Sequence, residues 1–297
     1  MAFAEDRTYY LYRALFAVGR YLPRPVATAL AHSSGLVSAA TMAGRRQLIT
    51  RHLDRATGGL AEPDRQRAVR QAFLSYAHYW LESARATGAS AEELDTRTSY
   101  EGLDHIDAAL AAGRGAILAL PHLGTWDSGG AFLASIGYPL TVVVEPIRPQ
   151  RLFDWFAAMR ASLGLEVVPL GPTAVAAVTR RLRQGGLVAL VSDRDLAGTG
   201  VEVEFFGERT RLPGGAATLA LRTGAALLPV AVYLQPKGRM HAVVRPALPV
   251  ARQATLREDV VRVTQALAAA MEELIRAHPE QWHLFQPNWP SDPGYRG

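Results

Sequence analysis

The chain of 297 residues contains no cysteine, and it also lacks a long apolar run. Without cysteine there are no disulfide bonds, thiol nucleophiles, iron–sulfur clusters or thiolate zinc sites, and this agrees with a location on the cytoplasmic side of a membrane. The longest uncharged stretch, residues 25–44, contains a histidine, three serines and two threonines, so it is too polar to span a bilayer. The opening Glu5, Asp6 and Arg7 do not resemble a secretory signal. We therefore expect a protein that can lie on a membrane but does not cross it.

The basic residues are unevenly distributed along the chain. Residues 1–75 contain 11 arginines against 5 acidic residues, a net charge of +6, whereas the whole chain carries +5. A basic face of this kind recruits a polyanion, either nucleic acid or an anionic membrane. Hydrophobic residues make up 49% of the chain, which is enough for a substantial folded core.

Residues 1–100 show helical periodicity throughout. Leu11, Leu15, Val18 and Leu22 fall on one face of the first helix, which predicts either a helix in a membrane interface or an ordinary packed helix. A second basic helix contains four arginines, and it predicts contact with an anionic surface or a merely solvated face. These arginines are Arg45, Arg46, Arg51 and Arg55.

From residue 101 short apolar runs alternate with helical segments. The runs at 115–120, 140–144, 165–170 and 187–192 lack period-two alternation, as is typical of strands buried on both faces. Helices are expected near 127–136, 149–162, 173–184 and 255–277, and further strands at 201–206, 227–233 and 240–246. This alternation predicts an α/β fold with a central, largely parallel sheet flanked by helices. We expect an N-terminal helical region over 1–100 and an α/β core over 101–297, forming one integrated domain, with a loose tail at 287–297.

Titratable residues follow three of the buried runs. His122 follows the first run, Glu145 the second, and Asp193, Arg194 and Asp195 the last. Because open α/β sheets bind ligands at the carboxyl ends of their strands, we expect these groups to share one edge of the sheet.

The sharpest local feature is the sequence PHLGTWD, in which His122 and Asp127 are five residues apart. Thr125 can cap a helix that places Asp127 in its first turn. Asp127 could then accept a hydrogen bond from one ring nitrogen of His122, leaving the other free to act as a general base. The alternative is a structural histidine beside a helix-capping aspartate.

Arginines on the helix at 149–162 suggest charged contacts. Arg160 shares a face with two phenylalanines, so it needs an anionic partner, Glu145 or Glu202, unless it reaches solvent at the edge of that face. Arg148 and Arg151 lie at the helix start, where cations oppose the helix dipole. They indicate either a phosphate ligand or two exposed charges.

The motifs of several other chemistries are missing. The sequence has no G-x-S-x-G elbow, no phosphate loop ending in GKS or GKT, and no H-E-x-x-H zinc helix. The other seven histidines show no spacing typical of metal ligands, so no metal site is predicted.

Taken together, these segments resemble the glycerolipid acyltransferases, and in particular the lipid A late-acyltransferase branch with its actinobacterial phosphatidylinositol mannoside acyltransferases. The resemblance spans roughly residues 8–285 and is carried by PHLGTWD, VVVEP, FDWFAAMR, SDRDLAGTGVEVEFFGERTRLPGG and ALLPVAVY. The chain lacks the EGTRS block of the enzymes that act on glycerol phosphate, which argues against glycerol-3-phosphate and lysophosphatidate as acceptors.

The resemblance implies that His122 and Asp127 are the catalytic pair. It places Glu145 and Arg160 in a charged network below the site. It gives Glu202 the place of the acidic residue in the third block of the wider family, although Glu204 on the same face could serve instead. It further implies an acyl-CoA co-substrate with no other cofactor, and a fatty acyl chain, palmitoyl being expected, moved to a mannose hydroxyl of a glycolipid.

The expected location is the cytoplasmic face of the cell membrane, as a peripheral protein, with acyl-CoA, a glycolipid acceptor and anionic lipid as partners and no nucleic acid. Two other classes stay open. A lipid esterase could use His122 and Asp127 with water as the acceptor, and a non-catalytic lipid- or nucleic-acid-binding protein would explain the basic N-terminus alone.

Overall fold

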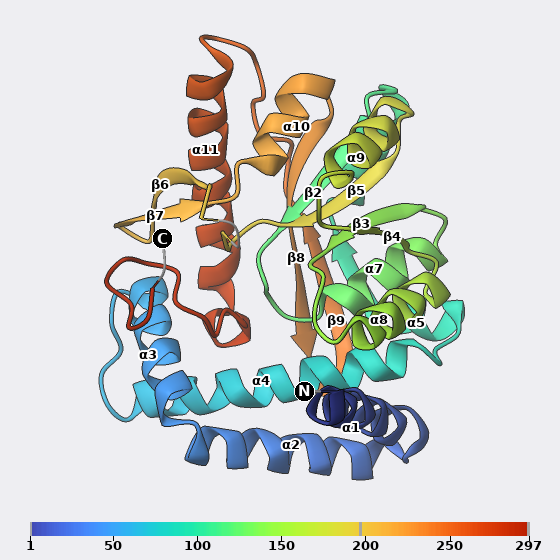
Figure 1. Cartoon of the computed structure of the whole chain (residues 1–297), viewed down its shortest axis with the longest axis vertical. Coiled ribbons are helices and arrows are strands. Elements are labelled where there is room, and N and C mark those ends of the chain that lie inside the picture. Colours follow the sequence, from blue (N-terminus) through green and yellow to red (C-terminus); the bar gives the residue numbers. More distant parts are fainter. Residues whose placement is uncertain (1, 196–197, 296–297) are drawn as a thin grey trace.

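The computed structural model describes residues 2–195 and 198–295. Of the four N-terminal helices, α1, α2 and α4 lie across one end of the molecule, with α4 between the sheet and the outer pair α1 and α2, and α3 runs at an angle to them (Figure 1). Their bounds are α1 Ala2–Tyr21, α2 Arg24–Thr41, α3 Ala43–Thr57 and α4 Asp64–Ala86. The helical N-terminal region is thus present. Residues at its end, which were expected to be helical, instead form the edge strand β1 (Thr98–Glu101).

A seven-stranded sheet forms the centre of the molecule, in the order β1-β9-β8-β2-β5-β3-β4. Every neighbouring pair is parallel except β8 and β9. The remaining strands are β2 Ala116–Leu120, β3 Leu140–Val144, β4 Glu166–Pro169, β5 Leu187–Val191, β8 Ala226–Gln235 and β9 Arg239–Val244. This pairing confirms the prediction of a largely parallel sheet. Its strands are apolar on both sides because helices cover both faces of the sheet.

Helices cover both faces of the sheet and complete two apolar cores. One core contains Val178, Leu219 and Leu267 from helices on one face, and the other contains Ile106 and Phe132 from helices on the opposite face. The helices that follow α4 are α5 Ala91–Arg97, α6 Leu103–Ala111, α7 Trp126–Ser135, α8 Gln150–Ser162, α9 Ala174–Arg183, α10 Gly215–Thr223 and α11 Leu256–Ala277. A separate antiparallel hairpin, β6 (Val201–Phe205) with β7 (Glu208–Leu212), packs on α11.

The sheet opens at the carboxyl ends of β3 and β5. β3 pairs with β5 only from Leu140 to Val142, whereas β2 stays paired with β5 as far as Val191. The last residues of β3 and β5 are half-buried, although the starts of both strands are buried. The separation leaves room between two neighbouring strands at the edge where ligands bind in this class of sheet.

The first helix packs through its aromatic residues and leaves its leucines outside. Tyr9 and Phe16 are buried in a cluster with residues of α4 and α8, whereas Leu11 and Leu15 are 58% and 55% exposed. The outer apolar strip of α1 and α2 comprises Tyr10, Leu11, Leu15, Val18, Tyr21, Val26, Leu30 and Val37. Among the described residues no helix combines the length and the apolar character needed to cross a membrane.

One expectation about surface segments is wrong, and in the basic helix α3 two arginines have partners within the chain. Residues 287–295 are not a loose tail, since Trp289 is fully buried; residues 296–297 lie outside the described part. In the basic helix α3, Arg51 donates to the carbonyl of Ser291, and Arg55 pairs with Glu208 and Asp292. Two of its four arginines therefore hold this C-terminal segment, because a buried carboxylate needs a cation beside it.

Candidate active site

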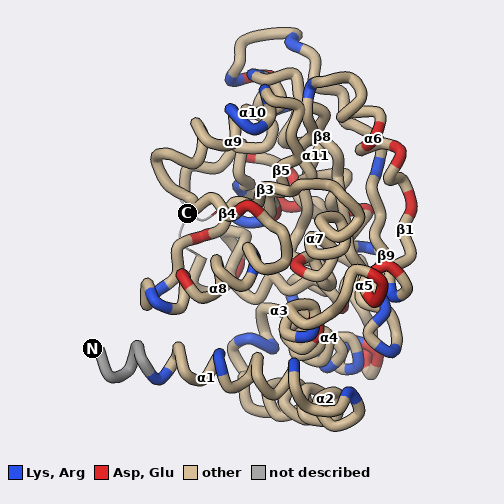
Figure 2. Tube along the Cα trace, turned by 90° about the vertical axis from the view of Figure 1, so that its right-hand side faces the viewer, with Lys and Arg blue, Asp and Glu red and all other residues tan. Residues whose placement is uncertain are grey.

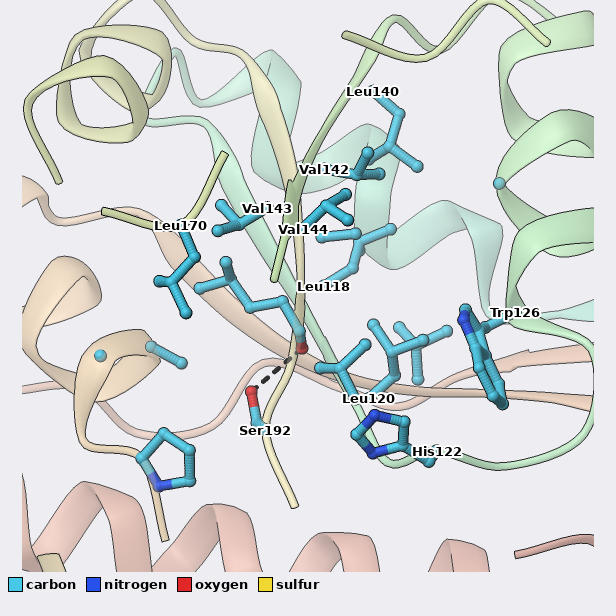
Figure 3. A pocket seen from close by; sticks show the side chains of 18 of the residues that line it. Leu118, Leu120, His122, Trp126, Leu140, Val142, Val143, Val144, Leu170 and Ser192 are labelled. Carbon is cyan, nitrogen blue, oxygen red and sulfur yellow. Dashed lines mark hydrogen bonds between the residues drawn. The ribbon is translucent and has the colours of Figure 1, made fainter. Parts of the chain in front are cut away.

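A cavity of about 520 Å³ opens at the carboxyl edge of the sheet, where β3 and β5 separate. Leucine and valine are the commonest residues in its walls, and His122 and Trp126 lie close together at one end (Figure 3). One lobe lies on the face of the sheet covered by α7, and we call it the α7 lobe; it is lined by Leu103, Leu133, Leu165, Ala242 and Val244. The α9 lobe lies on the opposite face and is lined by Leu170, Ala174, Val175, Val178 and Leu219.

His122 lies in the loop that follows β2. Its Nδ1 lies 2.6 Å from Oδ1 of Asp193, and its backbone N–H donates to the other carboxylate oxygen of Asp193 at 2.9 Å. The ring lies nearly perpendicular to that of Trp126, and His122 also lines the cavity. β2 and β5 are neighbouring strands, so the residues just past their ends, His122 and Asp193, meet. The expectation that these groups share one edge is confirmed.

Asp193 is fully buried and surrounded by donors. Besides the two bonds from His122, its carboxylate accepts a hydrogen bond from Nε1 of Trp282 at 2.8 Å, and its carbonyl accepts one from Asn288. Burial acts to raise the pKa of Asp193, but the charge of His122 and these hydrogen bonds outweigh it, so the pKa lies below its ordinary value. Asp193 is therefore an anion whose Oδ1 fixes the proton of His122 on Nδ1 and directs Nε2 elsewhere.

The prediction of a hydrogen bond between His122 and Asp127 is wrong. Asp127 lies in the first turn of α7, and both of its carboxylate oxygens have other partners: Arg160 donates to them at 2.8 and 3.1 Å, and Tyr79 donates at 2.7 Å. The loop turns at Gly124, which has a φ of +63°, before α7 begins. After this turn the carboxylate faces α8 and α4.

The Asp127, Arg160 and Tyr79 side chains form a buried charged network below His122. Burial acts to lower the pKa of Arg160, but the Asp127 carboxylate more than offsets this and raises it. Burial raises the pKa of Tyr79 well above its ordinary value, and Asp127 adds to that shift. The prediction that Arg160 needs an anionic partner is confirmed, but the partner is Asp127 and neither Glu145 nor Glu202.

Glu145 and Arg194 meet at the mouth of the cavity, where Arg194 donates to Glu145 at 3.0 Å, and both residues line it. The prediction that Glu202 belongs to the site is wrong. Its side chain is on the exposed face of the β6–β7 hairpin beside Arg209, since the alternation of that strand turns Val203 and Phe205 inward. Glu204 is exposed on the same face. Arg148 is exposed and does not line the cavity, while Arg151 stacks over the ring of Tyr9.

The sequence did not lead us to predict three residues of the site. Tyr79 comes from α4, and Trp282 and His283 come from the segment after α11; none has a local motif that points to His122. His283 donates its backbone N–H to the carbonyl of His122 at 2.7 Å, and its Nε2 lies 2.9 Å from Oγ of Ser75. Burial, together with the charge of His122, lowers the pKa of His283 to about 3, so this ring is neutral near pH 7.

A histidine held in this way can serve as a general base. With Nδ1 donating to a buried carboxylate, Nε2 can take a proton from a hydroxyl, and Asp193 stabilises the imidazolium that results. The apolar walls of the cavity suit a long acyl chain better than a polar substrate.

Comparison with known proteins finds similarity to bacterial acyltransferases. The family model of the bacterial lipid A biosynthesis acyltransferases matches residues 2–291. A phosphatidylinositol mannoside acyltransferase of Mycobacterium tuberculosis is 44% identical over 225 residues, covering 73% of this chain and 69% of that protein. One of Mycolicibacterium smegmatis is 38% identical over 285 residues, covering 93% and 91%. A lipid A biosynthesis acyltransferase of Haemophilus influenzae is 24% identical over 223 residues, covering 74% and 68%.

The match covers nearly the whole chain, including the helices, the sheet and the loop that contains His122. The chain therefore belongs to the bacterial lipid A biosynthesis acyltransferase family.

Proposed function

We propose that this protein is an acyl-CoA-dependent O-acyltransferase that moves a fatty acyl chain to a mannose hydroxyl of a phosphatidylinositol mannoside. The observation that carries the chemistry is the His122–Asp193 pair beside a long apolar cavity. The acceptor class is suggested by the names of two relatives that are 44% and 38% identical.

In the proposed mechanism His122 Nε2 removes the proton of the acceptor hydroxyl as its oxygen attacks the thioester carbonyl. Asp193 stabilises the imidazolium, and the thiolate of CoA then leaves as the new ester forms. A thiolate is a good leaving group, so it needs less help from an acid than an alkoxide would. The oxyanion needs hydrogen-bond donors, and we assign them to the first-turn N–H groups of α7, a helix whose N-cap Thr125 makes no side-chain capping bond.

We assign the acyl chain to the α7 lobe. Four of its five lining residues are buried, namely Leu133, Leu165, Ala242 and Val244, whereas in the α9 lobe Val175 and Leu170 are 59% and 46% exposed. A hydrocarbon chain gains most free energy by entering the lobe whose walls are more buried. The more open α9 lobe would then accommodate the polar part of the donor.

Filling the α7 lobe is expected to shorten the preferred chain. Ala242→Phe places a ring in the space that a palmitoyl tail would occupy, so kcat/KM should fall roughly tenfold or more with palmitoyl-CoA but little with octanoyl-CoA. The measurement is the rate ratio between the two donors. Val175→Phe in the α9 lobe is the matched control, and it should leave this ratio near the wild-type value. The reverse pattern would place the chain in the α9 lobe.

We further propose that the outer apolar strip of α1 and α2 lies in an anionic membrane surface on the cytoplasmic side. Support comes from its exposed leucines and valines and from the basic residues placed along α1 (Figure 2). Exposed apolar patches of this kind mark interaction sites. An arrangement of an apolar face with flanking cations is typical of helices at membrane interfaces.

Removing part of this strip should weaken binding to vesicles. The double substitution Leu11→Ser with Leu15→Ser takes away two side chains, each worth ~1.5–3 kcal/mol when buried in the interface, so the affinity should fall by at least about tenfold. The measurement is co-sedimentation with phosphatidylglycerol–phosphatidylcholine vesicles. Val261→Ser removes an exposed apolar side chain on α11 and should have little effect. Equal binding by the double variant would contradict the assignment.

The proposed function is tested by product analysis with the wild-type protein. Palmitoyl-CoA is offered together with phosphatidylinositol mannoside, phosphatidylinositol or lysophosphatidate, and the lipid products are separated. We expect acylation of the mannoside and little of the other two. Free palmitate as the only product would make the protein a hydrolase, and acylation of lysophosphatidate instead would make the acceptor assignment wrong.

A further inference from the structure

The segment that follows α11 is anchored by buried residues and reaches the catalytic pair; residues 281–285, Asn288, Trp289 and Asp292 are buried. Trp282, Leu284 and Trp289 are each at most 4% exposed. In Figure 1 this segment leaves the end of α11 and loops beside α3. Residues from the two ends of the sequence therefore meet next to a site built from its middle.

Four hydrogen bonds join this segment to the loop of His122 and to Asp193. Trp282 donates from Nε1 to the carboxylate of Asp193 at 2.8 Å, and Asn288 donates from its side chain to the Asp193 carbonyl at 3.1 Å. The backbone N–H of His283 donates to the carbonyl of His122, and Gly124 donates to the carbonyl of Gln281 at 2.9 Å. The segment therefore holds both members of the catalytic pair.

A second set of bonds fixes the segment itself. The buried carboxylate of Asp292 accepts from the backbone N–H groups of Asn288 and Trp289, which closes the turn. From α3, Arg55 donates to Asp292 at 2.9 Å, and Nε2 of His52 lies 3.1 Å from it. The turn that carries Asn288 is thus attached to the N-terminal helices as well as to the sheet.

We propose that Trp282 and Asn288 are positioning residues, and that the C-terminal segment, fixed by Asp292 to α3, holds Asp193 in the orientation that His122 requires. This inference rests on the proposed function only for its kinetic consequence. Oδ2 of Asp193 accepts from His122 N and from Trp282, so Oδ1 is left for Nδ1 of His122. Without the indole donor the carboxylate can rotate, and the 2.6 Å bond to Nδ1 loses its fixed geometry.

The test compares two tryptophan-to-phenylalanine substitutions in the same segment. Trp282→Phe removes the donor to Asp193, whereas Trp289→Phe removes a donor to the carbonyl of Phe205, which is outside the catalytic pair. Trp282→Phe should lower kcat about tenfold to a hundredfold, the effect of losing a hydrogen bond to a charged group, with KM for palmitoyl-CoA nearly unchanged. Trp289→Phe should keep kcat within about twofold. Asn288→Ala should lower kcat in the same direction as Trp282→Phe.

A spectroscopic measurement separates this inference from the proposed function. The proton in the short bond between His122 Nδ1 and Asp193 should give a low-field resonance in the proton NMR spectrum, absent in His122→Ala. Trp282→Phe should shift or broaden this resonance, and Trp289→Phe should leave it in place, whether or not the protein acylates a mannoside. An unchanged resonance in Trp282→Phe, or equal kinetic losses in the two tryptophan variants, would overturn the proposal.

Discussion

Replacing Asp193 by asparagine is expected to lower kcat for acyl transfer by about 10³–10⁴-fold while leaving the fold intact. In the wild type Oδ2 accepts two hydrogen bonds, from His122 N and Trp282 Nε1, and Oδ1 faces His122 Nδ1. The amide oxygen of asparagine will occupy the position with two donors, which turns its NH2 group toward Nδ1. That nitrogen must then accept a hydrogen bond, so the proton of the ring moves to Nε2, and the base is lost.

The measurement is a steady-state rate with palmitoyl-CoA and phosphatidylinositol mannoside, supported by thermal unfolding. Asp195→Asn is the matched control, since Asp195 follows the same strand, lines the cavity and has its Oδ2 bonded to the backbone of Gly200. It should cost far less than Asp193→Asn. Activity close to wild type in a folded Asp193→Asn protein would contradict the pairing of His122 with Asp193.

Removing the carboxylate of Asp127 is expected to destabilise the protein by ~3–5 kcal/mol, with a fall in Tm of roughly 10 °C. Asp127→Ala leaves the guanidinium of Arg160 without its anionic partner in a site where the Arg160 side chain is only 15% exposed. It also leaves the hydroxyl of the buried Tyr79 without its acceptor. An isolated buried charge is costly, so the loss should exceed that for a surface pair.

A double-substitution cycle identifies the cause of this loss. Asp127→Ala combined with Arg160→Met should be more stable than Asp127→Ala alone, because the unpaired cation has been replaced by an apolar side chain of similar length. Glu145→Gln, which breaks the half-exposed pair with Arg194, should cost no more than about 1 kcal/mol in denaturant unfolding. If Asp127→Ala unfolds at the wild-type midpoint, the buried network described here is not intact in solution.

The strands of the sheet could be predicted because their signal is local. The runs at 140–144 and 187–192 contain only residues that suit a strand buried on both faces, and they become β3 and β5 within one residue. The placement of His122, Glu145, Asp193 and Arg194 at one edge followed from the same reasoning. The edge strand β1 was not predicted because its four residues are mostly exposed and do not form an apolar run.

The partners of the site residues could not be predicted from spacing. His122 and Asp127 are close in sequence, but the turn at Gly124 separates their side chains, and Asp193 is 71 residues away along the chain. The pairing of Arg160 with Asp127 depends on where the fold places α8 relative to the first turn of α7, which no local pattern encodes. The buried C-terminal turn is a similar case, since its composition of Pro, Ser, Asp and Gly is typical of an exposed tail. It is fixed in part by the ion pair between Asp292 and Arg55, which come from opposite ends of the chain.

The most direct test of the central claim compares acyl transfer by the wild type and by His122→Ala, with radiolabelled palmitoyl-CoA and phosphatidylinositol mannoside. We expect the wild type to label the mannoside, and His122→Ala, shown to be folded by circular dichroism, to be slower by at least about a hundredfold. Equal labelling by the two proteins would remove His122 from the mechanism, and with it the role assigned to Asp193.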